Sequence, residues 1–475
     1  MSEPLPFLAI SLVVALAFYA FRSPAWRRAV TIAANLGFLA TFFTGIRSAA
    51  PFVAFLLGSY AGLRLIQWRR KAFVTVLAAT LIAFVWLKRY AFVPSGALLP
   101  FTYATVGLSY ILFRVIHLMI DFHSGEEREV SLISFFNYTC GFTTLVSGPI
   151  QGYREWLTTA DPAVRAPFSA LRAAESMERM LRGVFKTNVL ALVLSALQSR
   201  MLDAAMNLGS TADARILPGA LALVLYLLFL YCNFSGYIDI AIGAANLLGA
   251  SLPENFNRPF SAESVLDYWN ARWHITLSHW LRSYVYNPLM VSLMRRFPSR
   301  ALELPFAVLA FFTTFLLIGV WHGQTGEFVF YGLILGFGVS VNKIFQVVLV
   351  RRLGRKRSAA LSGSPVFVTL ARGLTFTWNT FTLVWFWADW HTIRALANAL
   401  APRMPIVWIL IFASATVILA AWESVFRETR SALREAPIVW SWCLRTALAV
   451  GAVVATAATT ALINRPAPDI VYKAF

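Results

Sequence analysis

The sequence predicts an all-α, polytopic integral membrane protein with roughly 11–13 transmembrane helices plus re-entrant or interfacial helices. Of its 475 residues, 59% are hydrophobic and only 13% are charged, whereas a soluble domain carries about 25% charged residues. Aromatic residues make up 15% of the chain, as suits a lipid-facing surface with interfacial rings. These values exclude a sizeable separate soluble domain, and we expect one membrane-embedded domain over 1–475.

Apolar runs follow one another along the chain. They lie near residues 6–21, 29–46, 50–63, 72–94, 100–120, 187–206, 217–233, 304–320, 326–350, 365–388, 404–424 and 438–463. The strongest basic segments between them are 64–71, 295–300, 351–357 and 427–434. Alternating the spans puts these segments on one face, which the positive-inside rule makes cytoplasmic.

The same rule explains the net charge of +19, so nucleic-acid binding is not expected. The chain begins Met-Ser-Glu-Pro without a positive n-region, which predicts a first span with its N-terminus outside instead of a cleaved signal peptide. By the same alternation, the loop 391–403 and the C-terminal tail fall outside.

The middle of the chain differs in composition. Residues 121–186 are the most polar stretch, and 134–148 and 266–289 are aromatic and polar together. These stretches indicate amphipathic, re-entrant or buried helices, because irregular backbone at membrane depth needs protein or a water cavity around it. A polar interior is therefore expected there.

His322 is the first candidate for chemistry. It stands in Gly319-Val-Trp-His-Gly323 directly after the apolar run 304–318, and an ionisable residue at such a depth indicates function by default. A neutral imidazole can take a proton from a hydroxyl near neutral pH, and the two glycines would allow close approach. The structural alternative is a histidine buried against Trp321 and hydrogen-bonded within the bundle.

The second candidate is the segment 268–284. If it is one helix, Trp269, Trp273 and Trp280 fall near one stripe, while His274 and Ser278 are i,i+4 neighbours on another face. With Arg272 and His279, such a helix could line a cavity and present donors to a polar ligand. The alternative is an interfacial helix with Trp and Arg at the headgroup level.

Asp239 lies inside an apolar stretch and needs a partner, for which Arg272 is the candidate. Asn255, with Asn257 and Arg258, indicates a loop that orders the cavity helix, a structural role being favoured over catalysis. The sequence contains no phosphate-cradling glycine loop, Gly-x-Ser-x-Gly elbow or His-Glu-x-x-His motif. No metal site is expected, and the three cysteines suggest no disulfide framework.

Taken together, these motifs resemble the membrane-bound O-acyltransferase superfamily, in the bacterial branch with alginate O-acetylases and D-alanyl lipoteichoic-acid transferases. The likeness covers about residues 100–390. It is carried by Phe234-Ser-Gly-Tyr237 with Asp239, Pro253-Glu-Asn-Phe-Asn-Arg-Pro259, Trp269 with Arg272-Trp-His-Ile-Thr-Leu-Ser278, and Gly319-Val-Trp-His-Gly323, with weaker support from Val106–Tyr110 and Ser147–Ile150.

The resemblance implies the fold of that superfamily, a many-helix enzyme of the bacterial inner membrane with a tunnel through a thinned core. It maps the essential histidine onto His322 and the second site histidine onto His274. We expect substrate contacts from Arg272, Trp273, Ser278, Asp239, Asn255 and Trp321. No cofactor is expected. The co-substrate is an acyl thioester, carried either by coenzyme A as acetyl-CoA or by an acyl carrier protein.

The expected reaction moves an acyl group, an acetyl group in our first hypothesis, to a hydroxyl of an extracytoplasmic polysaccharide or cell-envelope acceptor. A periplasmic esterase-like partner protein often serves such enzymes. The run Arg282-Ser-Tyr284 followed by Asn287–Ser292 departs from the alginate-type pattern, which argues against alginate as the acceptor. Two alternatives stay open: D-alanyl-type transfer from a carrier-protein thioester, and a secondary transporter or flippase.

Overall fold

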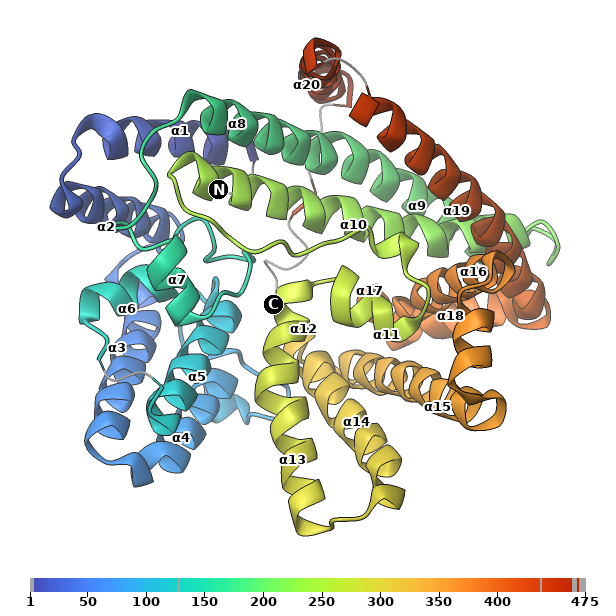
Figure 1. The fold of residues 1–475 in the computed structure, drawn as a ribbon, viewed down its shortest axis with the longest axis horizontal. Helices are drawn as coiled ribbons and strands as arrows, with labels where there is room; N and C mark the ends of the chain where they lie inside the picture. Colours follow the sequence, from blue (N-terminus) through green and yellow to red (C-terminus); the bar gives the residue numbers. More distant parts are fainter. Residues whose placement is uncertain (1–3, 127–128, 436–437, 464–467, 470–475) are drawn as a thin grey trace. The chain divides into compact units, whose positions relative to one another are not determined.

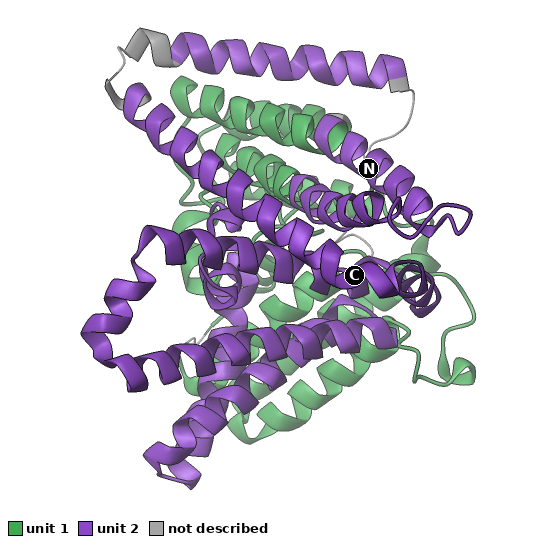
Figure 2. Cartoon of the chain, turned by 90° about the vertical axis from the view of Figure 1, so that its right-hand side faces the viewer, with its two compact units in different colours: residues 1–188, 234–254, 464–475 green, residues 189–233, 255–463 purple. Residues whose placement is uncertain are grey.

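The computed structural model describes residues 4–126, 129–435, 438–463 and 468–469. The chain forms two compact units (Figure 2). Unit 1 comprises residues 1–188 and 234–254 with the C-terminal residues 464–475, and unit 2 comprises residues 189–233 and 255–463. Helix α10, Ile216–Leu247, contributes its first half to unit 2 and its second half to unit 1. The single domain expected over 1–475 stays a prediction.

Unit 1 is built from helices (Figure 1), some joined by turns and others by longer irregular stretches such as 88–107 and 160–169. They are α1 Pro4–Ala20, α2 Pro24–Ala40, α3 Ile46–Trp68, α4 Phe73–Leu87, α5 Leu108–Ser124, α6 Leu132–Thr139, α7 Tyr153–Thr159 and α8 Ala170–Phe185. Ser131 and Ser169 cap α6 and α8 by accepting from backbone N–H groups, the usual role of serine at a helix start. The stretch 141–152, with the predicted break at Ser147–Ile150, is non-helical.

Helix α8 continues through a π-helical turn, Lys186–Leu190, into α9, Ala191–Met206. Within unit 1, α8 lies beside the second half of α10 (Figure 1). Glycines make this contact close: a Cβ on Gly183 would stand 2.5 Å from the Gly236 carbonyl oxygen, and one on Gly243 would stand 2.5 Å from Met180. Small residues serve this purpose between membrane helices, where lipid removes the hydrophobic drive for association.

Unit 2 holds the remaining elements. They are α11 Val265–Asp267, α12 Ile275–Leu281, α13 Asn287–Arg296, α14 Glu303–His322, α15 Gly326–Ser362, α16 Pro365–Thr382, α17 Val384–Trp387, α18 Trp390–Leu400, α19 Met404–Glu435 and α20 Ile438–Ile463. A turn at 323–325 makes α14 and α15 antiparallel neighbours (Figure 1). They approach through Gly319 and Gly332, since a Cβ on Gly319 would lie 2.9 Å from the Gly332 Cα.

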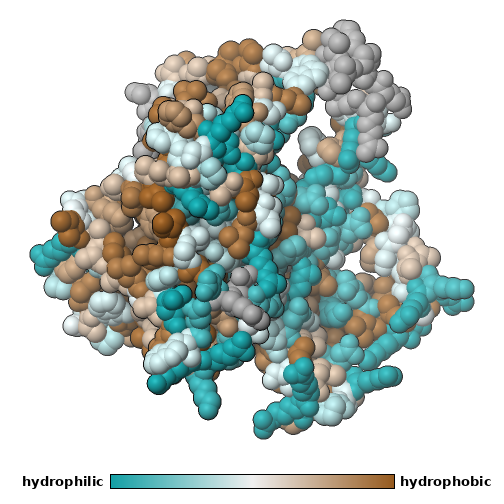
Figure 3. All heavy atoms as spheres, turned by 60° about the vertical axis from the view of Figure 1, so that its left-hand side comes forward, coloured by the Kyte–Doolittle hydropathy of each residue, from teal (hydrophilic) through white to brown (hydrophobic). Residues whose placement is uncertain are grey.

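Eight helical stretches in the described residues are long and apolar enough to cross a membrane. They are Ile46–Trp68, Arg70–Leu87, Ala170–Met206, Ile216–Leu247, Arg300–His322, Gly326–Ser362, Trp390–Ala432 and Trp442–Leu462. Hydrophobic side chains also occupy broad areas of the surface (Figure 3); Leu16 and Ile82 are 77% and 69% exposed. The helical, multi-pass fold class is thus confirmed.

The count of roughly 11–13 spans stays a prediction, because several apolar helices, such as the 17-residue α1, are shorter than the eight. The orientation of the chain also stays a prediction. Residues 1–3 and most of the C-terminal tail lie outside the described residues.

The prediction of one helix over 268–284 is wrong. A π-helical turn, Tyr268–Arg272, ends at Trp273, whose backbone is extended. His274 then takes a left-handed conformation, and α12 begins after it. The three tryptophans are buried, but they share no helical stripe, because the break at 273–274 redirects the chain.

Candidate active site

His322 ends α14 and is 2% exposed. Its imidazole is enclosed by aromatic rings: the ring centroids of Trp321, Tyr331 and Phe386 lie 4.7, 5.9 and 5.0 Å away. A Cβ on Gly323 would overlap the Phe328 ring, so this glycine lets the chain turn tightly behind the histidine. His322 is therefore buried in an apolar enclosure, as its position after a long apolar run led us to expect.

His274 is held by pairing between two loops of unit 2. Phe256 and Trp273 form an isolated antiparallel β-bridge, and the Ile275 N–H donates to the Asn255 carbonyl at 3.0 Å. This pairing fixes His274 at φ 46° and ψ 51°, a conformation that costs a non-glycine residue about 1 kcal/mol or more. The side chain is 1% exposed. A strained backbone at a buried histidine is typical of a functional position.

Asn255 determines which ring nitrogen of His274 carries the proton. Its Oδ1 accepts from the Thr276 N–H at 3.1 Å and the Thr276 Oγ1 at 2.9 Å, and it lies 3.2 Å from His274 Nδ1. Because a backbone N–H can only donate, the atom facing it must be the amide oxygen. His274 Nδ1 is therefore the protonated nitrogen, and Nε2 carries the lone pair.

Burial lowers the pKa of His274 to about 3, so the imidazole is neutral at cellular pH. Trp321 stands beside both histidines, with its ring 6.3 Å from that of His274 and 4.7 Å from that of His322. The structure thus brings His274, His322, Trp321 and Asn255 together in unit 2.

The other predicted site residues in the segment 268–284 make different kinds of contact. Trp273 stacks on Tyr268 with centroids 5.5 Å apart and meets Phe256 edge-on, so it stabilises the loop pairing. Ser278 lies one turn beyond His274, its N–H donating to the His274 carbonyl at 3.1 Å. Arg272 Nε donates to Asp267 Oδ2 at 2.6 Å.

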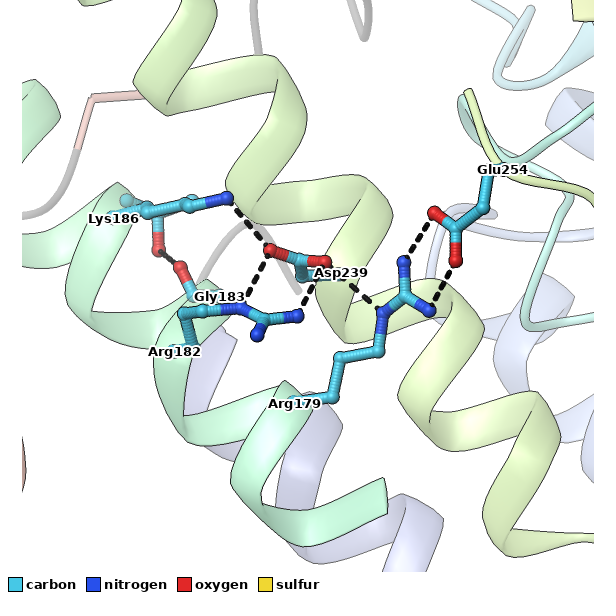
Figure 4. Close-up of polar contacts among 7 residues, drawn as sticks. Arg179, Arg182, Gly183, Lys186, Asp239 and Glu254 are labelled. Atoms are coloured by element: carbon cyan, nitrogen blue, oxygen red, sulfur yellow. Dashed lines mark hydrogen bonds and ion pairs between the residues drawn. The ribbon is translucent and has the colours of Figure 1, made fainter. Parts of the chain in front are cut away.

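The predicted pairing of Asp239 with Arg272 is wrong. Asp239 on α10 is 6% exposed and accepts from three cations of the helix Ala170–Met206 (Figure 4). Arg179 Nε donates at 3.0 Å, Arg182 Nε and Nη2 at 3.3 Å each, and Lys186 Nζ at 2.8 Å. The close glycine contact of α8 with α10 brings these groups together from positions 53 to 60 residues apart.

Sequence reasoning missed residues at two places. Tyr331 of α15 and Phe386 of the four-residue helix α17 enclose His322, but nothing in their apolar sequence surroundings marks them. Glu423 and Ser261 were missed as partners of the loop residue Arg258. Arg258, at φ 47°, donates to Glu423 Oε1 at 2.5 Å, and Ser261 also donates to that oxygen. The sequence could not pair Arg258 with Glu423, because the two lie 165 residues apart.

In the part of the chain that the structure describes, no three His, Cys, Asp or Glu side chains gather closely enough to hold a metal ion. Within the described residues, two buried polar atoms of unit 2 lack a hydrogen-bond partner: Asn255 Nδ2, on the residue that holds His274, and Trp269 Nε1. Such donors are available to a polar ligand.

Comparison with family models identifies the chain. The model of MBOAT, the membrane-bound O-acyltransferase family, matches residues 55–382, more than two thirds of the sequence. The chain belongs to this family. The resemblance seen in the motifs is thereby confirmed, and membership places this membrane-bound O-acyltransferase family protein among acyltransferases with an acyl donor.

Individual relatives of this MBOAT protein fall into two groups. It is 28% identical over 231 residues to a teichoic acid D-alanyltransferase of Bacillus subtilis, covering 48% of this chain and 56% of that protein. It is 31% identical over 257 residues to a probable alginate O-acetylase AlgI of Pseudomonas aeruginosa, covering 54% of this chain and 45% of that protein. The similarity to the Azotobacter vinelandii AlgI is 28% over 326 residues, 67% of this chain and 60% of that one.

The aligned regions thus span between 45% and 60% of the length of these relatives. Both groups have bacterial members, and the two names describe different acyl groups and acceptors. Family membership therefore gives the reaction class without choosing between acetyl and D-alanyl transfer.

Proposed function

We propose that the protein is an O-acyltransferase of a bacterial inner membrane. It moves an acyl group, acetyl in the first case, from a cytoplasmic thioester donor to a hydroxyl of an extracytoplasmic polysaccharide or cell-envelope acceptor. The observation that carries the proposal is that His322 and His274 are both buried and both lie in ring contact with Trp321, in a member of the MBOAT family.

In this mechanism His322 acts as general base. The acceptor hydroxyl oxygen attacks the thioester carbonyl carbon, and the hydroxyl proton passes to the imidazole of His322. The tetrahedral intermediate then collapses: the C–S bond breaks, the new C–O ester bond remains, and the thiolate leaves and takes up the proton. The apolar rings around His322 exclude water, which would otherwise compete as the acceptor.

His274 and Asn255 supply positioning. Because Asn255 fixes the proton on His274 Nδ1, the neutral ring presents a lone pair at Nε2, which can accept a hydrogen bond from a hydroxyl but cannot donate one to an oxyanion. His274 could either position a substrate or stabilise the oxyanion, and this tautomer favours positioning. Asn255 Nδ2 is the donor suited to the developing negative charge on the carbonyl oxygen. Arg272, Ser278 and Trp273 hold this loop in place, and Trp321 packs beside both imidazole rings.

The experiment measures acyl transfer from labelled acetyl-CoA in membranes that contain the His322→Ala protein. Loss of a general base costs about 10²–10⁴-fold in rate, so transfer should nearly vanish while the protein stays folded in detergent. His391→Ala, which removes an exposed histidine, is the matched control. Normal transfer by a well-folded His322→Ala protein would refute the mechanism.

D-alanyl transfer is the second candidate, favoured by the similarity to the Bacillus subtilis enzyme and by a 27% identity over 282 residues to that of Streptococcus thermophilus. It would use the same histidines with a carrier-protein thioester as the donor. Dependence on a soluble carrier, with no transfer from acetyl-CoA, would select it. The expected periplasmic esterase-like partner protein is part of the acetyl-transfer proposal and not of the D-alanyl alternative.

A further inference from the structure

The cluster of Arg179, Arg182, Lys186, Asp239 and Glu254 in unit 1, called the cationic cluster below, carries more positive than negative charge. Three cations face two carboxylates (Figure 4). Asp239 is buried and takes donors from all three cations. Glu254 binds Arg179 through two hydrogen bonds of 2.6 Å. One unit of positive charge is therefore not neutralised within the cluster.

The excess positive charge is accessible to solvent at Arg182. Its side chain is 52% exposed, whereas those of Arg179 and Lys186 are 17% and 20% exposed. Its Nε and Nη2 donate to Asp239, and Figure 4 shows the remaining guanidinium nitrogen pointing away from that carboxylate. Within the described residues, nothing accepts a hydrogen bond from this Nη1.

The backbone beneath the cluster is held firmly. The contacts of Gly183 with Gly236 and of Met180 with Gly243 hold α8 close to α10, so the three cations of one helix all reach Asp239 on the other. The π-helical turn begins at Lys186, and such turns occur often at functional sites because they redirect a side chain. The result is a preorganised set of donors of the kind that phosphate groups bind.

Contacts within unit 1 place the cluster near segments predicted to be cytoplasmic. Arg27, in the basic stretch after α1, donates to the Arg165 carbonyl at 3.2 Å. The next residue, Ala166, donates to the Gly249 carbonyl at 3.1 Å. Gly249 lies between the end of α10 and Glu254, so the loop that carries Glu254 lies at the basic end of α1.

We propose that the cationic cluster binds the phosphate next to the pantetheine arm of the thioester donor, the group that coenzyme A and a carrier protein's phosphopantetheine share. The inference rests on the proposed function, which requires a donor of this kind. The phosphate contacts Arg182 Nη1 and takes the place of the Glu254 carboxylate on the Arg179 fork. Asp239 holds the three cations together while its single charge offsets only one of them.

Substitution of Glu254 provides a distinctive test of the proposal. It is 58% exposed and competes with the incoming phosphate for Arg179. Replacing it by the neutral isostere glutamine should therefore strengthen phosphate binding, whereas replacing Arg182 should weaken it. A purely structural cluster would show no such opposite effects.

The test is equilibrium dialysis of labelled coenzyme A against the full-length protein in phosphatidylcholine nanodiscs. We expect Arg182→Gln to weaken binding about tenfold, as for loss of one charged hydrogen bond, and Arg182→Lys to restore part of the affinity. Glu254→Gln should tighten binding by about threefold or more. Arg200→Gln, which removes an exposed cation from the same long helix, should bind like wild type.

Three further probes identify the source of the phosphate. Pantetheine without phosphate should bind weakly and equally to all variants, and a phosphopantetheinylated carrier protein, compared with its apo form, should follow the same order of variants as coenzyme A. If coenzyme A and carrier binding are unchanged while retention of phosphatidylglycerol changes, the cluster binds a lipid headgroup and the donor assignment is wrong. If none of these ligands responds, the phosphate site is refuted.

Failure of this inference is separable from failure of the proposed function. Dialysis measures binding without turnover, so coenzyme A binding that depends on Arg182 would support the cluster even if no acyl transfer occurred. Conversely, acyl transfer that requires His322 but shows the same donor KM in Arg182→Gln and wild type would refute the cluster alone.

Discussion

Replacing Asn255 by leucine should damage both stability and acyl transfer. The substitution keeps the side-chain volume but removes Oδ1, which holds His274 Nδ1 and two donors of Thr276. Asn255 is 0% exposed, so water cannot replace the lost acceptor. The Thr276 N–H stands in the first turn of α12, where helical N–H groups have no partner within the helix.

The magnitude follows from the three contacts. Each net hydrogen bond contributes about 0.5–1.5 kcal/mol, and a buried donor left without a partner costs about 1–3 kcal/mol. Some relaxation of the loop lowers the sum, and we expect a loss of about 2–4 kcal/mol in the free energy of unfolding. Transfer should fall about 100-fold, because the lone pair on His274 Nε2 is no longer fixed and the Nδ2 donor is gone.

Stability is measured by equilibrium unfolding in mixed micelles of increasing SDS fraction, and transfer with labelled acetyl-CoA in nanodiscs. Asn257→Leu is the matched control, since Asn257 is exposed and lies two residues away in the same loop; it should change unfolding by less than about 0.5 kcal/mol. An Asn255→Leu protein with near-wild-type stability and transfer would refute the role assigned to this side chain.

Two further predictions concern the same unit. Gly319→Ala should lower stability by about 1–3 kcal/mol and reduce transfer, because its Cβ would overlap the Phe328 carbonyl oxygen and separate α14 from α15; Gly451→Ala, with nothing within 4 Å, should be neutral or stabilising, and equal thermal unfolding of the two variants would contradict the contact. The pKa of His274 is lowered from 6.5 to about 3, so the unfolded chain binds a proton that the folded chain does not. The stability contribution is complete above pH 6.5 and is lost by about 1.4 kcal/mol per pH unit as the pH falls toward 3. His274→Gln should reduce that slope in acid unfolding by the share of one histidine, while His391→Gln should leave it unchanged; equal slopes for the wild type and His274→Gln would disprove the assignment.

The sequence predicted the membrane class and the family because both depend on long or ordered signals. Apolar runs report the lipid environment directly, and the Gly319–Gly323 and Arg272–Ser278 motifs mark buried polar residues that lipid spans avoid. The helix break at His274 could not be predicted, since the loop pairing with Asn255 that enforces the left-handed backbone is a tertiary contact.

The partner of Asp239 shows the other limit. Arg272 is the nearer candidate in the motif region, but it pairs with Asp267, five residues before it. The actual partners precede Asp239 by 53 to 60 residues and meet it through the contact of Gly183 with Gly236. Glycine spacing on two helices predicts close approach only when it is known that these helices are neighbours.

The close contact between α8 and α10 also matters when the chain enters the bilayer during synthesis. Inserted alone, α10 would carry Asp239 into hydrocarbon at a cost of about 2.5–3.5 kcal/mol, and the preceding helix would bring unpaired cations. As consecutive antiparallel helices joined by residues 207–215, they can neutralise each other before leaving the translocation channel. The ion pairs of Asp239 with the helix Ala170–Met206 therefore leave less uncompensated charge in the bilayer than either helix would bring alone.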